Sequence, residues 1–158
     1  MNGRYDAAGP ESEFQPGSRG RVLRNRRGIT SVRQLERDES AALLAATQRA
    51  IDETRVDQRF AARDIRVMHQ RWLHELYEWA GEYPFRAGNG RCARLLAMLM
   101  GLQAGLPALD FGWIRAARKR EYIAAVHAAL DRDYDPMTKI FHGVIERTLR
   151  RASKTSSE

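Results

Sequence analysis

The sequence predicts an all-α protein of about five helices. Apolar residues recur at every third or fourth position in several segments, as they do on one face of an amphipathic helix. No segment alternates apolar and polar residues as a half-buried strand does, and no internal repeat is present. Hydrophobic residues make up 43% of the 158 positions, which suffices for the core of one domain.

Two helices are expected in the first half of the chain. Residues 32–53 are rich in good helix formers, and residues 61–80 carry a clear apolar face that ends before Gly81. The apolar stripe of the first helix comprises Leu43, Leu44 and Ile51. The face of the second comprises Ile65, Met68, Trp72, Leu76 and Trp79. Both faces are expected to point into the core.

Three more helices are expected in the second half. Residues 89–104 are apolar nearly all round, which predicts a helix buried at the centre of the domain. Residues 112–131 and 136–150 predict two further helices, and the sequence DRDYDP indicates the turn between them. The inward residues of the fourth helix are expected to be Ile114, Tyr122, Ile123, Val126 and Leu130. Those of the fifth are expected to be Met137, Ile140, Phe141, Val144, Ile145 and Leu149.

The net charge of +7 is concentrated at the two ends of the chain. Residues 1–29 hold six arginines and three acidic residues, and residues 147–158 hold four basic residues and one acidic residue. We expect residues 1–29 to form a flexible basic tail, residues 30–150 the helical domain and residues 151–158 a disordered tail. Because the domain between the tails is close to neutral, nucleic acid is the least favoured class of partner.

The chain lacks the sequence features of a membrane or secreted protein. No apolar run is long enough to span a bilayer. The first residues, MNGRYDAAGPESEF, lack the apolar stretch of a signal peptide. The single cysteine, Cys92, excludes an internal disulfide framework and a cysteine-rich zinc site. We therefore expect a cytoplasmic protein without a membrane partner.

One stretch carries the features of an anion site. Residues 83–96, YPFRAGNGRCARLL, place two glycines and an asparagine directly before an apolar helix, and two arginines within its first turns. The first amides of a helix are unpaired and its dipole makes that end positive, so a bare glycine backbone there favours phosphate binding. Arg91 and Arg94 are three positions apart and lie on one face. The alternative is a glycine turn with two surface arginines paired to acids, and both interpretations stay open.

The sequence AGNGRCAR resembles the signature of the Fic family, His-x-Phe-x-Asp/Glu-Gly-Asn-Gly-Arg-x-x-Arg. LHELYEWAGEY and REYIAAVHAAL resemble other family segments in the same order, and the resemblance covers residues 24–146. It implies a Fic-like helical domain that transfers AMP from ATP to a hydroxyl group of a target protein. The residues that the resemblance assigns to the nucleotide phosphates are Gly88, Asn89, Gly90, Arg91 and Arg94.

The chain departs from the family pattern at two chemical positions. Tyr83 stands where the family has its histidine base, and Ala87 stands where it has an acidic metal ligand. The long family segment before the motif, which aligns the target, is also missing. The resemblance therefore implies ATP as substrate or ligand, no intact catalytic residue and no Mg²⁺ ligand. The histidines present are expected to pack rather than to act as bases; they are His69, His74, His127 and His142.

Three functions follow from these observations. The first is a Fic-type AMP transferase that keeps its phosphate site but has impaired chemistry. The second is a non-catalytic nucleotide-binding or scaffold protein on the same fold. The third is a nucleic-acid-binding protein that acts through its arginine-rich ends.

Overall fold

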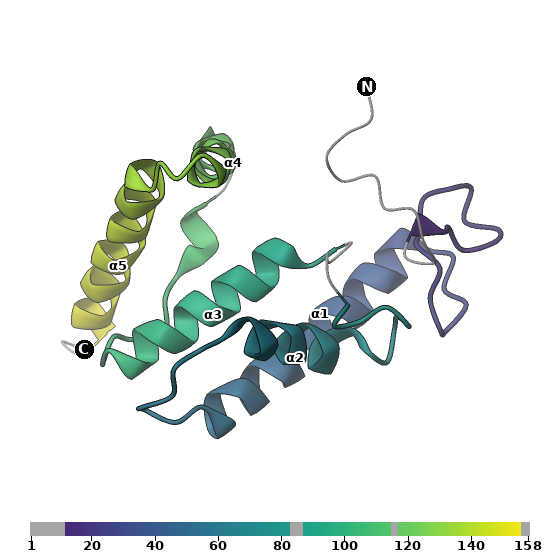
Figure 1. Ribbon diagram of the computed structural model, residues 1–158, viewed down its shortest axis with the longest axis horizontal. Helices are drawn as coiled ribbons and strands as arrows, with labels where there is room; N and C mark the ends of the chain where they lie inside the picture. The colour runs from purple at the N-terminus through teal and green to yellow at the C-terminus, as the bar shows by residue number, and fades with distance from the viewer. Residues whose placement is uncertain (1–11, 83–86, 115–116, 156–158) are drawn as a thin grey trace. The chain divides into compact units, whose positions relative to one another are not determined.

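The computed structural model describes residues 12–82, 87–114 and 117–155 (Figure 1). Its helices are α1 (Val32–Glu53), α2 (Ala62–Leu73), α3 (Asn89–Gln103), the 3-10 helix η2 (Phe111–Trp113), α4 (Ala117–Leu130) and α5 (Asp135–Thr155). The described ranges contain no strand, only an isolated bridge between Phe14 and Leu23. The all-α prediction is confirmed. Within these ranges, no helix combines the length and the apolar character that crossing a membrane requires.

The chain forms two compact units that divide inside α3, between Leu96 and Ala97. This division is not expected from the sequence, which predicts one domain over residues 30–150. The first unit contains α1, α2 and the start of α3. The second contains the rest of α3, η2, α4 and α5.

The segment that precedes α1 is part of the first unit's core. Val22 is 1% exposed and Ile29 is 5% exposed. The Asn25 side chain accepts from the Ile29 amide and donates to the Ile29 carbonyl, both at 2.9 Å. From residue 12 onward, this segment is therefore packed rather than the flexible tail that the sequence predicts, because apolar anchors lie among its arginines. Residues 1–11 lie outside the described residues.

Helix α1 has the predicted bounds, and the Ser31 hydroxyl caps it by accepting from the Gln34 amide. Its buried face differs from the predicted stripe. Leu44 is 73% exposed and Ile51 is 37% exposed. The face that packs inward consists of Leu35, Glu39, Ala42, Leu43 and Ala46. The predicted stripe was right at Leu43 and wrong at Leu44 and Ile51, because the true one, at helical spacing, includes a glutamate.

Helix α2 ends at Leu73, earlier than predicted. Met68 and Trp72 are buried on α2, whereas Leu76 is buried from the turns that follow it. The Leu76 carbonyl accepts from the Arg26 amide at 2.8 Å, a bond from a segment fifty residues earlier in the chain. The bond gives the carbonyl of the buried Leu76 a partner outside the helix.

Helix α3 spans nearly the predicted residues but is buried on one side only. Cys92, Leu95 and Leu99, spaced by three and four positions, are buried. Met100, by contrast, is 54% exposed, and Ala93 is also exposed. The prediction of a helix buried all round at the centre of the domain is therefore not met, because apolar composition alone does not show which side has a partner.

In the second unit, α4 and α5 pack through small residues. Ala125 is 1% exposed and Val144 is fully buried. The larger residues predicted to point inward from α4 do not, since Ile123, Val126 and Leu130 are 45%, 38% and 58% exposed. The α4 prediction was therefore wrong at these three positions, whereas Ile114 and Tyr122 are half-buried.

Helix α5 extends further than predicted in the C-terminal direction. It begins after a turn in which the Asp133 carboxylate accepts from the Asp135 amide at 3.2 Å, and it runs to Thr155. Residues 151–155 are therefore helical rather than a disordered tail. The three residues after Thr155 lie outside the described residues.

Candidate functional site

The glycine stretch forms the start of α3, as the sequence predicts. Gly88 has a φ of +88°, and its carbonyl accepts from the amides of Arg91 and Cys92, both at 2.9 Å. A Cβ on Gly88 would lie 2.6 Å from Cζ3 of Trp72. Only glycine fits here, because both the backbone conformation and the close indole exclude a side chain. The helix N-terminus is thus set tightly against Trp72.

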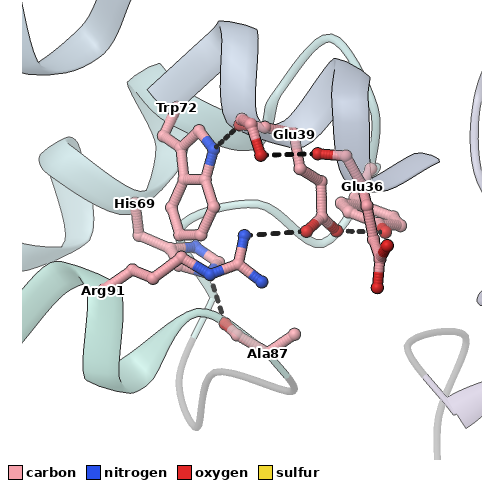
Figure 2. Close-up of polar contacts among 8 residues, drawn as sticks. Glu36, Glu39, His69, Trp72, Ala87 and Arg91 are labelled. Carbon is pink, nitrogen blue, oxygen red and sulfur yellow. Dashed lines mark hydrogen bonds and ion pairs between the residues drawn. The ribbon is translucent and has the colours of Figure 1, made fainter. Parts of the chain in front are cut away.

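His69 holds the two ends of the segment that leads into this turn. Its Nδ1 accepts from the Gly81 amide at 2.8 Å. Its Nε2 donates to the Ala87 carbonyl at 2.9 Å (Figure 2). The carbonyl can only accept, so the proton is on Nε2. Burial lowers the pKa of His69, although the bond to Ala87 acts in the opposite direction. His69 is therefore a neutral positioning residue, as expected for a packing histidine.

Glu39 of α1 is the acceptor that joins three parts of the first unit. The side chain is buried, and its two oxygens accept from the Tyr77 hydroxyl and from Nη1 of Arg91, each at 2.8 Å. Its backbone carbonyl accepts from Nε1 of Trp72 at 2.9 Å. Figure 2 shows the Arg91 guanidinium directed at this carboxylate. Burial, followed by the bond to Glu39, raises the pKa of Tyr77 well above its usual range, so the hydroxyl stays a donor.

The two arginines of the motif differ in what they contact. Arg91 pairs with Glu39, and its Cζ lies 4.8 Å from the centre of the Trp72 ring. Arg94 folds back toward the start of the helix, because a Cβ on Gly90 would lie 3.3 Å from its Nη1. Within the described residues Arg94 makes no hydrogen bond or ion pair. Arg91 therefore matches the alternative of an arginine paired to an acid, whereas Arg94 keeps its donors available.

The remaining predicted site residues are placed as follows. Asn89 is exposed in the first turn of α3, and Ala87 is half-buried just before it. Tyr83, at the position of the family's histidine, lies outside the described residues. Ala87 has no carboxylate, and its carbonyl accepts from His69, so this position does not fit Mg²⁺. In the described ranges, no group of three or more His, Cys, Asp or Glu side chains is arranged to hold a metal ion.

A hollow of about 540 Å³ lies beside Arg91 in the first unit. Its lining combines the apolar Leu43 and Leu44 of α1 with polar residues of the same helix, among them Glu39 and Ser40. Such a mixed lining suits a group with an apolar face and polar edges. The hollow therefore gives room for an organic group next to the start of α3.

Sequence reasoning missed Glu39 and Tyr77. A signal for Glu39 was present, because it lies four positions from Leu35 and four from Leu43, on the apolar face of α1. A charged residue at such a position needs a buried partner. Cys92, next to Arg91, is 2% exposed, and burial raises the pKa of its thiol to about 11, so it is a packing residue.

Comparison of the chain with protein-family models, with curated proteins and with solved structures gives no significant match. The site is therefore defined by features of this chain alone. These features are the glycine turn, the available Arg94 and the two positioning contacts made by His69 and Glu39.

Replacing Glu39 is expected to destabilise the first unit. Glu39→Ala leaves the buried Tyr77 hydroxyl and part of the Arg91 guanidinium without an acceptor, which is expected to cost about 2 to 4 kcal/mol. Urea denaturation, monitored by tryptophan fluorescence, measures this loss of stability. Glu36→Ala, on the exposed side of α1, is the matched control and should change stability by less than about 0.5 kcal/mol. Equal midpoints for the two variants would contradict the role of Glu39.

His69 is expected to make stability fall in mild acid. Because burial lowers its folded pKa below 6.5, the unfolded chain binds a proton at higher pH than the folded chain does. The contribution of His69 to the free energy of unfolding is fully present above pH 6.5. It is lost as the pH falls toward the pKa of His69 in the folded protein. Urea midpoints measured at intervals from neutral pH to mild acid should show the loss in the parent and in His142→Gln, an exposed control. A less stable His69→Gln variant with the same pH dependence would show that another group is responsible.

Proposed function

We propose that the chain binds the phosphates of a nucleotide at the N-terminus of α3, as a Fic-like protein whose AMP-transfer chemistry is impaired. The observation that carries the proposal is Arg94, which lies folded back over Gly90 beside the first amides of the helix. Helix amides, the helix dipole and an available guanidinium together favour a phosphate group. ATP is the ligand that the sequence resemblance implies.

The residues of the turn contribute in different ways. Gly90 leaves the backbone bare beside Arg94, which allows a phosphate oxygen to approach closely, whereas Gly88 permits the tight turn against Trp72. Asn89 is exposed in the first turn, and the sequence resemblance assigns it to the phosphates. Arg94 supplies a planar fork of donors, while Arg91 remains paired with Glu39 and contributes mainly by holding the turn in place. The hollow beside Arg91 has room for the organic part of the nucleotide.

Efficient transfer of AMP would require groups that the chain does not offer at the expected positions. The hydroxyl of the target has to lose its proton as its oxygen bonds to the α-phosphorus, and pyrophosphate has to leave with its charge stabilised. Tyrosine, with an ordinary pKa of about 10, is a weak base at the Tyr83 position. His69 does not replace it, because both of its ring nitrogens are engaged with the backbone.

A second candidate is a nucleotide-binding or scaffold protein without catalysis. It is favoured because His69 is bonded to the backbone and Arg91 is paired with Glu39. These residues hold the turn in a fixed geometry rather than facing a substrate. The two candidates differ only in whether any AMP reaches a protein. Transfer of label from ATP separates them.

Nucleotide binding is expected to depend on Arg94. Arg94→Ala removes charged hydrogen bonds worth about 1.5 to 3 kcal/mol, so its ATP affinity should fall by about tenfold or more. Isothermal titration calorimetry measures the change. Arg49→Ala, an exposed arginine of α1, removes the same charge elsewhere and should bind like the parent. If Arg94→Ala binds ATP as tightly as the parent, the site lies elsewhere.

The chain is expected to transfer AMP feebly or not at all. Loss of a general base alone typically lowers a rate by about 10² to 10⁴-fold. Incubation with α-labelled ATP and a cell lysate, followed by electrophoresis and autoradiography, measures transfer. Tyr83→His is expected to restore little, since the segment that aligns the target is still missing. Strong labelling that persists in Tyr83→Phe would reveal a different base and contradict the proposed impairment.

A further inference from the structure

The second unit contains a strongly basic hollow of about 890 Å³ along α5. Trp113 of η2 and Gly143 of α5 line it together with a single carboxylate, that of Glu146. Ser153 and six cationic side chains complete the lining; the cations are Arg118, Lys139, Arg147, Arg150, Arg151 and Lys154. We call this hollow the α5 basic groove. Its six cations and one carboxylate make it strongly positive, whereas the charges summed over the middle of the chain are close to neutral.

Most of these cations lie on one face of α5. Lys139, Gly143, Arg147 and Arg151 follow one another at intervals of four residues, and Arg150 and Lys154 are also four apart. Like charges at this spacing repel each other and weaken a helix by a few tenths of a kcal/mol per pair. The row therefore opposes the stability of the helix unless an anion neutralises it.

Acidic residues of the chain neutralise only part of the row. Arg150 pairs with Glu146 at 3.1 Å, and Arg151 pairs with Asp110. Within the described residues, Lys139, Arg147 and Lys154 form no ion pair, although Arg147 lies near enough to Asp110 to help lower the pKa of its carboxyl group. Three exposed cations on one side of α5 thus remain available to an external ligand.

An aromatic residue orients a further cation at the groove. The indole of Trp113 lies against α5, where a Cβ on Gly143 would come within 3.1 Å of its ring carbons. The Arg118 guanidinium stacks over this indole, with its Cζ 4.1 Å from the ring centre, and its Nη1 lies 3.8 Å from the exposed Glu121 carboxylate. A stacked guanidinium has lost part of its freedom already and still presents its N–H edges. Arg118 therefore loses less entropy when it binds an anion.

We propose that the α5 basic groove binds the phosphodiester backbone of a nucleic acid. From Lys139 to Lys154 the helix rises by about 22 Å, a length along which one DNA strand carries about six phosphates. A single nucleotide would reach only a part of the row, so the groove fits an extended polyanion. Four of its six cations are arginines, whose planar forks match phosphate oxygens. The inference is independent of the nucleotide site at α3.

The test is fluorescence anisotropy of the full chain with a labelled twenty-nucleotide DNA, as a single strand and as a duplex, at low and at moderate salt. The parent is expected to bind at least one form, with an affinity that falls as salt rises. The variant Lys139→Gln, Arg147→Gln, Lys154→Gln should bind at least tenfold more weakly. Its slope of log affinity against log salt should be smaller by about 2 to 3, since each lost phosphate contact lowers it by about 0.7 to 0.9.

The matched control removes three exposed cations from the first unit: Arg49→Gln, Arg59→Gln and Arg63→Gln. It carries the same net charge as the groove variant and is expected to bind like the parent. Thermal melts of both variants must match the parent, and single substitutions replace the triple variant if it does not fold. Absence of DNA binding at low salt, or equal weakening in both variants, overturns the proposal. Equally effective competition by a polyglutamate of similar charge also overturns it, in favour of an acidic protein segment.

Discussion

The buried carboxylate of Glu39 is the constraint on which the first unit depends. A desolvated charge is costly unless donors surround it, and here the donors come from two separate parts of the chain. Tyr77 approaches from the turns after α2, and Arg91 from the first turn of α3. Satisfying one carboxylate therefore fixes both segments against α1. A second constraint, His69, ties Gly81 to Ala87 and so sets where α3 begins.

These contacts explain why local sequence rules predicted some elements and not others. The bounds of α1 and the start of α3 follow from signals close in sequence, namely the Ser31 cap and the Gly88 turn. The turns that follow α2 bond instead to Arg26, fifty residues before Leu76, and no local pattern contains such a contact. The segment from residue 12 to α1 was not predicted to be packed, because its two buried apolar residues, Val22 and Ile29, stand among many arginines in the sequence.

At the candidate phosphate site, too, local sequence patterns predicted only part of the structure. Residue types and spacing identified the glycine turn and its two arginines as a group, since both depend on local backbone geometry. They did not distinguish Arg91 from Arg94, because that difference depends on Glu39, which lies fifty-two residues earlier in the chain. A motif indicates which donors are near a helix start, whereas the partners contributed by other elements decide which of them remain available.

In the second unit, too, the spatial arrangement of charges matters more than their number in the sequence. Summed over a sequence, opposite charges cancel whether or not they are neighbours in space, and this average made nucleic acid the least favoured partner. In α5, helical spacing gathers cations on one face, and the nearby carboxylates of Glu146 and Asp110 engage only two of them. Electrostatic attraction of a polyanion follows the local arrangement rather than the sum, because mobile ions screen charges more than about 10 Å apart. The extension of α5 to Thr155 matters for this reason: it converts a run of basic residues into an ordered row.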